Sequence, residues 1–263
     1  MGASSAMDLA GLVGTLRAAG CVFAEDEARL LVEAAGDAEE LAALTARRVA
    51  GEPLEQVVGY AELGGVRIAV APGVFVPRQR SLALVRLAAT GLRAGDVVVD
   101  LCCGTGALGA VLAATVPGLE VWAADVDPDA VACARRNLPP ARVVEGDLYD
   151  ALPRGLRGRV AAVVANAPYV PTDDIALMPP EARDHEHRVA LDGGADGLDV
   201  QRRVATGAPA WLRPGGRLLV ETSRGQAATS AALQRAAGLT VTVERDDDLD
   251  ATVAVGTLVR SET

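Results

Sequence analysis

The sequence predicts an α/β fold in which helices cover both faces of a mostly parallel sheet, preceded by a small helical region and a β-hairpin. Three observations predict it. From Gly95 onward, short apolar runs typical of buried strands alternate with runs of helical spacing. Residues 1–50 show helical spacing only. Between these regions, two short apolar runs flank a Gly pair.

The N-terminal region contains three segments with apolar residues at helical spacing. The residues that carry this spacing are Leu9, Leu12, Val13 and Leu16, then Leu30, Leu31 and Ala34, and then Leu41, Leu44 and Val49. The acidic residues Glu25–Glu27 open the second segment, as is typical of a helix start. We therefore expect a helical domain over residues 1–51.

A different pattern follows this helical region. The apolar runs Val57–Tyr60 and Val66–Val70 lie on either side of Leu63-Gly64-Gly65, which predicts a β-hairpin. With the following segment Pro72–Arg78, the hairpin forms a predicted linker over residues 52–78. Residues 79–263 then form the predicted α/β domain.

Strands and helices alternate through most of this domain. We expect strands at 96–100, 120–124, 142–145, 160–166 and 217–221, and helices at 107–115, 128–137, 200–212 and 226–237. The alternation predicts a parallel sheet with helices on both faces. The last two strands, 240–244 and 252–258, have no helix between them, so we expect an antiparallel hairpin at the edge of the sheet.

Composition limits the classes of function and location. The formal net charge is −10 and the sequence pI is about 4.8, which disfavours binding to nucleic-acid backbones. The 4 cysteines form no C-x-x-C pair, so reduced thiols are expected. No apolar stretch reaches the roughly 20 residues that a membrane span needs. Met1–Leu9 lacks the pattern of a signal peptide. These observations predict a cytoplasmic protein without a membrane partner.

A glycine-rich turn connects the first predicted strand of the α/β domain to its helix. Gly104, Gly106 and Gly109 satisfy G-x-G-x-x-G, in which glycines let backbone N–H groups approach a ligand at a helix N-terminus. The pattern also fits dinucleotide enzymes and plain strand-to-helix turns. Asp100, at the end of the strand, could meet the ammonium group of a bound amino acid but would repel a pyrophosphate. This residue favours S-adenosylmethionine over a dinucleotide.

Two further carboxylates follow neighbouring strands. Asp125 lies about 20 residues after the turn, where a carboxylate can accept hydrogen bonds from both ribose hydroxyls. The alternative is a surface residue that precedes a helix, for which Asp127 is as good an N-cap. Asp147 could accept from the exocyclic amine of adenine, with Leu148 against the ring, or could be a solvated turn residue.

The segment Asn166-Ala167-Pro168-Tyr169 follows the fourth predicted strand. An amide nitrogen is a poor nucleophile, and two acceptors aimed at its two N–H hydrogens can hold its lone pair toward an electrophilic methyl group. Asn166 offers a side-chain oxygen and Ala167 a backbone carbonyl. Pro168 stiffens the turn and Tyr169 can pack over a flat substrate group. A simple Asx-Pro turn is the alternative.

These motifs together resemble the protein-(glutamine-N5) methyltransferases that act on bacterial peptide-chain release factors, whose signature is Asn-Pro-Pro-Tyr. Other matching stretches are Gly51–Gln56, Pro72–Arg78 and Ala190–Leu198. The resemblance implies a Rossmann-like, seven-stranded class I methyltransferase domain after a helical domain and a hairpin. It implies methyl transfer from S-adenosylmethionine to the side-chain amide nitrogen of a glutamine in a protein substrate.

The resemblance also implies which residues form the site. Residues implied to hold the cofactor are Asp100, Cys102, Cys103, Gly104, Thr105, Gly106, Asp125, Asp147, Leu148 and Asn166. Asn166, Ala167, Pro168 and Tyr169 would hold the glutamine amide, and Phe75–Arg78 would border the substrate channel. Ala167 replaces the first proline of the family signature, and Gln79-Arg80-Ser81 stands where the family usually has acidic residues.

Three alternatives stay open. The chain could be a paralogue with another protein target, or an adenine-N6 nucleic-acid methyltransferase, because the same turn serves exocyclic amines. It could also be an NAD-dependent oxidoreductase or a binding module. The run Asp184–His187 resembles a metal cluster, but no convergent ligands lie nearby in the sequence. We expect it to be a loop over the site, with no metal.

Overall fold

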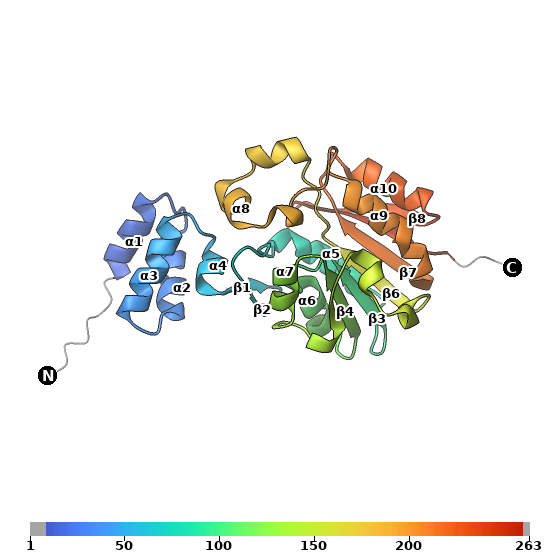
Figure 1. Ribbon diagram of the computed structural model, residues 1–263, viewed down its shortest axis with the longest axis horizontal. Coiled ribbons are helices and arrows are strands. Elements are labelled where there is room, and N and C mark those ends of the chain that lie inside the picture. The colour runs from blue at the N-terminus through green and yellow to red at the C-terminus, as the bar shows by residue number, and fades with distance from the viewer. Residues whose placement is uncertain (1–8, 260–263) are drawn as a thin grey trace.

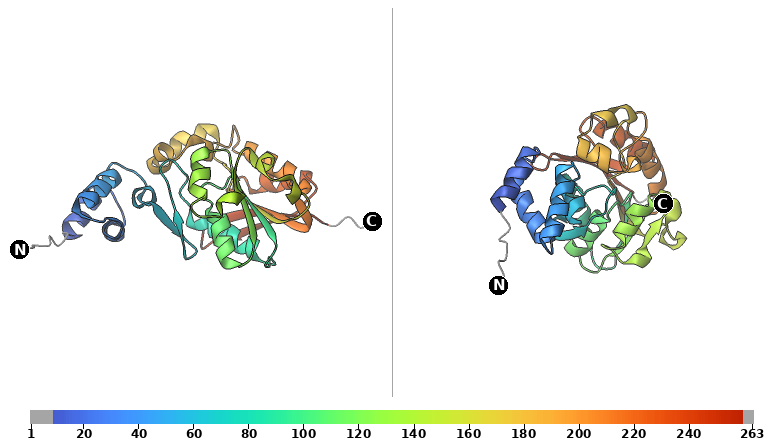
Figure 2. Two further views of the ribbon diagram at one scale, coloured as in Figure 1. Left: turned by 60° about the horizontal axis from the view of Figure 1, so that its bottom comes forward. Right: turned by 60° about the vertical axis from the view of Figure 1, so that its left-hand side comes forward.

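The computed structural model describes residues 9–259 and is elongated, with a helical bundle at one end and a helix-covered sheet at the other (Figure 1). Residues 1–8, which hold most of the segment considered for a signal peptide, lie outside the described residues. The bundle consists of α1 (Leu9–Ala18), α2 (Ala24–Ala34) and α3 (Ala38–Val49). A short helix and a β-hairpin connect it to the sheet (Figure 2).

The helical bundle has a small core of its own. Leu16 and Leu31 are fully buried, and they belong to a cluster completed by Cys21, Ala24, Ala28 and Val57. Helix α3 is capped by Asp37, whose carboxylate accepts a hydrogen bond from the Glu40 N–H at 2.8 Å. The three helices form where the apolar spacing predicts them.

Arg48 on α3 links the bundle to the rest of the molecule. Its Nε donates to Glu27 Oε2 and its Nη1 to Glu181 Oε1, each at 2.6 Å. The Arg48 and Glu27 side chains are each 10% exposed. The hydrogen bond that Arg48 donates to Glu27 raises the pKa of Arg48 above its usual value, so the guanidinium remains charged although it is largely buried.

We expect Arg48→Met to lower the free energy of unfolding of the helical bundle by about 3 kcal/mol, because it leaves Glu27 buried without its partner. Urea unfolding followed by protease cleavage within the bundle measures this. The matched control is Arg29→Met, since Arg29 pairs with Asp26 on the surface and should cost little. Equal effects of the two substitutions would contradict the prediction.

The linker begins with a helix that the sequence analysis did not predict. Helix α4 (Leu54–Val58) follows Pro53 and ends at Gly59, whose φ is 82°. The expectation of a strand from Val57 was therefore wrong: β1 (Tyr60–Leu63) starts three residues later and pairs antiparallel with β2 (Val66–Ala69). An apolar Val-Val pair fits either a strand or a buried helical turn, and here Val57 completes the bundle core.

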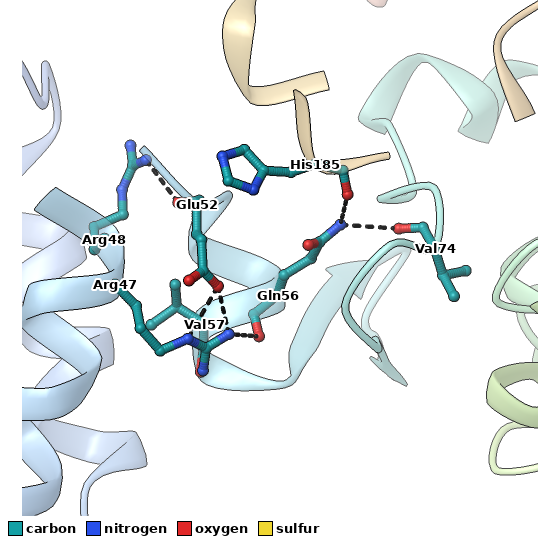
Figure 3. Close-up of polar contacts among 7 residues, drawn as sticks. All are labelled: Arg47, Arg48, Glu52, Gln56, Val57, Val74 and His185. Carbon is teal, nitrogen blue, oxygen red and sulfur yellow. Dashed lines mark hydrogen bonds and ion pairs between the residues drawn. The ribbon is translucent and has the colours of Figure 1, made fainter. Parts of the chain in front are cut away.

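Polar contacts fix α4 to two other segments (Figure 3). The buried Gln56 donates from Nε2 to the carbonyl of Val74 at 3.1 Å and to that of His185 at 3.0 Å. Arg47 donates to Glu52 and to the Gln56 carbonyl, which closes the turn between α3 and α4. Through Gln56, the helical bundle is tied to the segment Pro72–Arg78 and to α8 (Pro180–His185).

The main sheet has seven strands in the order β5-β4-β3-β6-β7-β9-β8. The strands are β3 (Val97–Leu101), β4 (Glu120–Asp125), β5 (Val143–Glu145), β6 (Val160–Ala165), β7 (Leu212–Glu221), β8 (Thr240–Asp246) and β9 (Ala251–Thr257). The first five are parallel, and β9 pairs antiparallel with both β7 and β8. This confirms the predicted parallel sheet with an antiparallel hairpin at one edge.

Helices cover both faces of this sheet (Figure 1). They are α5 (Leu82–Ala89), α6 (Ala107–Thr115), α7 (Pro128–Ala134), α9 (Asp199–Gly207) and α10 (Ala227–Ala236). Val98 faces α5–α7, whereas its neighbours Val97 and Val99 face the side covered by α9. Every residue of β3 is buried, because both faces of a parallel sheet pack against helices.

The helices of the α/β domain differ from prediction at several points, and the helix expected over 128–137 ends at Ala134. Helices α5 and α8 were not predicted. The helix expected over 200–212 ends at Gly207, where the Ala208–Ala210 turn containing Pro209 replaces it before β7 begins. Other 3-10 turns are Gln79–Ser81, Pro140–Arg142, Leu148–Ala151, Arg154–Leu156, Thr172–Leu177 and Arg188–Ala190. Within residues 9–259 no helix has both the length and the apolar character of a membrane span.

Candidate active site

A cavity of about 660 Å³ opens where β3, β4, β5 and β6 end, a size typical of ligand pockets. Ligands of open α/β sheets bind at this edge. The structure brings most of the predicted site residues to its wall: Cys102, Cys103, Gly104, Thr105, Asp125, Asp147, Leu148, Asn166, Ala167, Pro168 and Tyr169. Phe75, Pro77, Arg80 and Ser81 line it from the linker and α5 side. Asp100 and Gly106 do not line it.

The glycine-rich turn runs from β3 into α6 along the floor of the cavity. Gly104 has φ 54°, and a Cβ placed there would meet only Phe75, at 4.0 Å. Gly106 has φ 74°, and a Cβ there would lie 3.0 Å from Leu138. Gly104 therefore leaves the cavity side of the turn open, while Gly106 allows the turn to pack against the protein.

Asp125 holds this turn in place from the end of β4. Its Oδ2 accepts a hydrogen bond from the Gly104 N–H at 2.8 Å, and its Oδ1 accepts from the Asp127 N–H at 3.0 Å. Burial raises the pKa of Asp125, and these hydrogen bonds counteract the rise. The carboxylate still faces the cavity, where its remaining lone pairs can accept from a ligand.

Asp147 and Leu148 follow β5 and also line the cavity. Leu148 has φ 50°, a backbone conformation that turns the chain sharply at the cavity. The half-exposed Asp147 carboxylate accepts from Arg203 of α9 at 2.5 Å. The sequence analysis did not identify Arg203, which also lines the cavity.

The Asn166–Tyr169 segment leaves β6 beside the glycine-rich turn. Asn166 Nδ2 lies 3.5 Å from Ser81 Oγ, so its amide NH2 faces α5. Gln226 Nε2 donates to the carbonyl of Tyr169 at 2.9 Å and to that of Asp196 at 3.0 Å. Among residues 9–259, no donor is bonded to Asn166 Oδ1 or to the Ala167 carbonyl. Both oxygens are therefore available as acceptors.

The segment 190–198 braces this turn from outside. The Val170 N–H donates to the Leu191 carbonyl at 3.1 Å, and the Gly193 N–H donates to the Val170 carbonyl at 2.9 Å. Gly197 lies against the Tyr169 carbonyl, where a Cβ would come within 2.3 Å. The glycines of this segment permit the close approach.

The rim formed by Val74–Arg78 is held by a buried carboxylate. Glu186 Oε1 accepts from the Val76 N–H at 3.1 Å and from Arg78 Nη2 at 2.6 Å. Burial raises the pKa of Glu186, and Arg78 counteracts this rise. Arg78 also lies 5.1 Å from the centre of the Phe75 ring.

The two histidines of the Asp184–His187 run make contacts with different parts of the protein. The His185 carbonyl accepts from Gln56, whereas His187 Nδ1 lies 2.6 Å from Asp127 Oδ2. Potential metal ligands of Asp127, Asp129 and His187 lie within 4.8 Å of one another. The sequence did not predict this trio, because Asp127 and His187 are 60 residues apart. Asp127 also caps α7 through the Asp129 N–H, so its carboxylate is already engaged.

Asp100 lies beneath the turn rather than on the cavity wall. Its side chain is fully buried, and Oδ2 accepts from the Gly109 N–H in α6 at 2.9 Å, while Oδ1 has no partner among the described residues. Burial raises the pKa of Asp100 to about 8. The carboxyl group is therefore largely protonated at neutral pH in the absence of a ligand.

Between about pH 4 and pH 8 the folded protein keeps the Asp100 proton, whereas the unfolded chain, with a pKa near 3.8, has lost it. The free energy of unfolding should therefore fall as the pH rises through this window and level off above it. The side chain of the Asp100→Asn variant cannot ionise. We therefore expect its free energy of unfolding to fall less over this pH window than that of the unsubstituted protein. Denaturant titrations at several pH values measure the difference.

The same variant tests whether Asp100 meets the ammonium group of the cofactor. Unchanged affinity for S-adenosylhomocysteine in calorimetry is expected if the side chain stays beneath the turn. Identical pH slopes for the variant and the original protein would contradict the stability prediction.

Several residues of the site were missed by the sequence analysis. Ser81, Arg80 and Glu221 lie behind Asn166, and Gln226 supports Tyr169. Glu221 carries a readable signal, because it is a charged residue that ends the apolar run of β7. The others belong to segments whose position depends on the folded sheet.

Several known proteins are similar to this chain. Residues 65–178 match the family model described as "Methyltransferase small domain". The chain is 43% identical over 184 residues to a release factor glutamine methyltransferase of Streptomyces coelicolor, covering 68% of this chain and 65% of that protein. It is 40% identical over 198 residues to one of Geobacter sulfurreducens, covering 73% and 69%.

Two further similarities add to this. A 4-amino-L-phenylalanine/4-methylamino-L-phenylalanine methyltransferase of Streptomyces pristinaespiralis is 39% identical over 201 residues, covering 73% of this chain and 68% of that protein. In structure, the chain resembles a methyltransferase of Pyrococcus furiosus with a TM-score of 0.56 at 18% identity, covering 75% of this chain and 91% of that one. The last likeness supports the fold, a seven-stranded class I methyltransferase sheet, as predicted.

The site geometry agrees with the resemblance seen in the sequence. The Geobacter relative is 40% identical, and the match covers 69% of its length. The chain therefore belongs to the release factor glutamine methyltransferase family, whose members take their methyl group from S-adenosylmethionine.

Proposed function

We propose that this protein transfers a methyl group to the side-chain amide nitrogen of a glutamine in a protein substrate, a peptide-chain release factor. The observation that carries the proposal is the pair of free acceptors at the end of β6, Asn166 Oδ1 and the Ala167 carbonyl, beside the glycine-rich turn. This function implies a cytoplasmic location, where release factors meet the ribosome.

The cavity fits S-adenosylmethionine in size and in chemistry. Gly104 leaves its cavity side open, and the Asp125 carboxylate offers acceptors to ribose hydroxyls. Leu148 would lie against the adenine ring, and Asp147 would accept from its amine. When bound, this cofactor supplies an electrophilic methyl group on a sulfonium.

The chain's own residues would then orient the amide. Asn166 Oδ1 and the Ala167 carbonyl accept the two N–H hydrogens, which points the nitrogen lone pair away from both. Tyr169 packs over the flat amide group, and burial raises the pKa of its hydroxyl, so it stays protonated. Holding two reactants in line can supply roughly 7–11 kcal/mol of a bimolecular barrier. The nitrogen loses its proton only after transfer, so the site needs no strong base.

We also propose that the helical region 1–51 and the linker 52–78 present the protein substrate to the catalytic domain 79–263. In support, Gln56 bonds to the rim at Val74, and Phe75 and Pro77 line the cavity. A protein substrate resting on the bundle would thus reach the cavity along this rim.

The test is a transfer assay with isotopically labelled S-adenosylmethionine and the release factor of the same organism. Mass spectrometry should locate the label on one glutamine, and a release factor with that glutamine changed to alanine should remain unlabelled. Transfer to DNA or RNA oligonucleotides but not to the release factor would overturn the proposal in favour of an adenine-N6 activity.

A second candidate is methylation of a free aromatic amino acid on its amine. Arg80, 43% exposed on the cavity wall, could bind the carboxylate of such a substrate, and one relative acts on 4-amino-L-phenylalanine. Adding this amino acid as a third acceptor separates the two functions. Label in the amino acid alone would favour the second candidate.

A further inference from the structure

A chain of polar groups extends from Asn166 through Ser81 and Glu221 to Arg80, on the α5 side of the cavity. Ser81 precedes α5 and is 3% exposed, and Glu221 ends β7 and is 2% exposed. Buried polar groups are costly unless they are hydrogen-bonded, so such a chain needs a structural or functional reason.

The contacts run in sequence from solvent to the site. Arg80 Nε lies 3.3 Å from Glu221 Oε1. Burial raises the pKa of Glu221, and the Ser81 hydroxyl beside the carboxylate and Arg80 counteract this rise. Glu221 Oε2 is buried and has no hydrogen-bond partner among residues 9–259. Asn166 Nδ2 then lies 3.5 Å from Ser81 Oγ.

The carboxylate gives this chain a direction. Arg80 lies beside Glu221, and the ionised carboxylate only accepts hydrogen bonds, so the neighbouring Ser81 hydroxyl can supply a donor to it. Ser81 Oγ is then left with lone pairs and accepts from Asn166. Of the two ends of the Asn166 amide, only the NH2 can donate. Asn166 Oδ1 must therefore face the cavity.

The orientation matters because the two ends of an asparagine amide have almost the same shape. An Asn166 turned by half a rotation would offer NH2 hydrogens to the substrate's own NH2 group, and the two would repel. Packing alone distinguishes the two states poorly, whereas the hydrogen-bond chain distinguishes them by the charge at its end.

We propose that Ser81 and Glu221 are positioning residues that fix which end of the Asn166 amide faces the substrate nitrogen. The inference rests on the proposed function for the identity of the acceptor. Arg80 supports the arrangement by keeping an opposite charge beside the buried carboxylate.

The first test observes Asn166 directly and needs no substrate. The sequence contains 2 asparagines, Asn137 and Asn166. In protein labelled with 15N in asparagine, NMR should show two side-chain NH2 signal pairs, and Asn166→Ala identifies one of them by its loss. Asn137, whose NH2 donates to the carbonyls of Ala69 and Thr105, is the internal reference.

Ser81→Ala and Glu221→Gln should each shift the Asn166 pair and leave the Asn137 pair in place. Both should lower kcat roughly tenfold or more, with KM and the affinity for S-adenosylhomocysteine nearly unchanged, because the variants disturb only the alignment of the reacting groups. Ser81→Thr, which keeps the hydroxyl, should restore both the signal and the rate.

The matched control is Thr222→Val, which removes a buried hydroxyl next to Glu221 in the chain and should alter neither readout. Melting temperatures show whether Ser81→Ala folds, and Glu221→Gln, nearly identical in shape, serves if it does not. An unmoved Asn166 signal pair or an unchanged kcat overturns the inference. If the variants shift the Asn166 signals as expected but the unsubstituted protein labels no glutamine, only the proposed function is contradicted.

Discussion

Asn166→Ala is expected to lower the rate of methyl transfer at least about a hundredfold, comparable to losing one preorganised hydrogen-bonding group from an enzyme active site. The variant removes Oδ1, one of the two oxygens that orient the amide lone pair, and leaves the Ala167 carbonyl in place. The measurement is single-turnover transfer of a labelled methyl group to the release factor.

Binding of S-adenosylhomocysteine provides the control for this variant. Asp125, Asp147 and the glycine-rich turn lie on the other walls of the cavity, so calorimetry should give nearly the original affinity. A variant with undiminished turnover would eliminate the two-acceptor mechanism. Equal losses of turnover and of cofactor affinity would instead make Asn166 a binding residue.

Gly197→Ala should abolish most activity by acting from outside the cavity. Gly197 has φ 75°, and an added Cβ would come within 2.3 Å of the Tyr169 carbonyl and 2.5 Å of Gln226 Nε2. The Tyr169 carbonyl and the Gln226 amide must then separate, which frees the Asn166–Tyr169 segment to move. A misplacement of about 1 Å can cost about a hundredfold in rate.

Gly215→Ala is the matched control for this prediction. Gly215 has φ 79°, and a Cβ there would meet no heavy atom within 4 Å. Both variants carry the backbone cost of a side chain at positive φ, about 1–3 kcal/mol. Only Gly197→Ala should lose turnover once the temperature is low enough for both to be folded. Similar turnover in the two variants would show that segment 190–198 does not hold the site.

The sheet and most of the cavity wall could be predicted from the sequence because their signals are local. The buried strands β3 and β6 are unbroken apolar runs, and the glycine-rich turn and Asn166–Tyr169 directly follow them. Helix α4 was missed because Val57 and Val58 read equally well as a strand. The groups behind Asn166 could not be found, since Ser81 lies 85 residues from it and Arg80 lies 141 residues from Glu221.

The position of Asp100 shows a different limit. The sequence places a carboxylate at the end of β3, but the direction of its side chain depends on where α6 begins. The N–H of Gly109 draws the carboxylate beneath the turn. Whether a strand-end side chain points into a pocket or under it is decided by the helix that follows.

The single amide of Gln56 has a mechanical consequence. One NH2 group bonds to the carbonyls of both Val74 and His185. The backbone at Val74 and the backbone at His185 are therefore coupled through a single side chain. A displacement of either segment would therefore strain the hydrogen bond that Gln56 makes to the other. Movement of α4 would therefore act together on Val74, which lines the cavity, and on the end of α8.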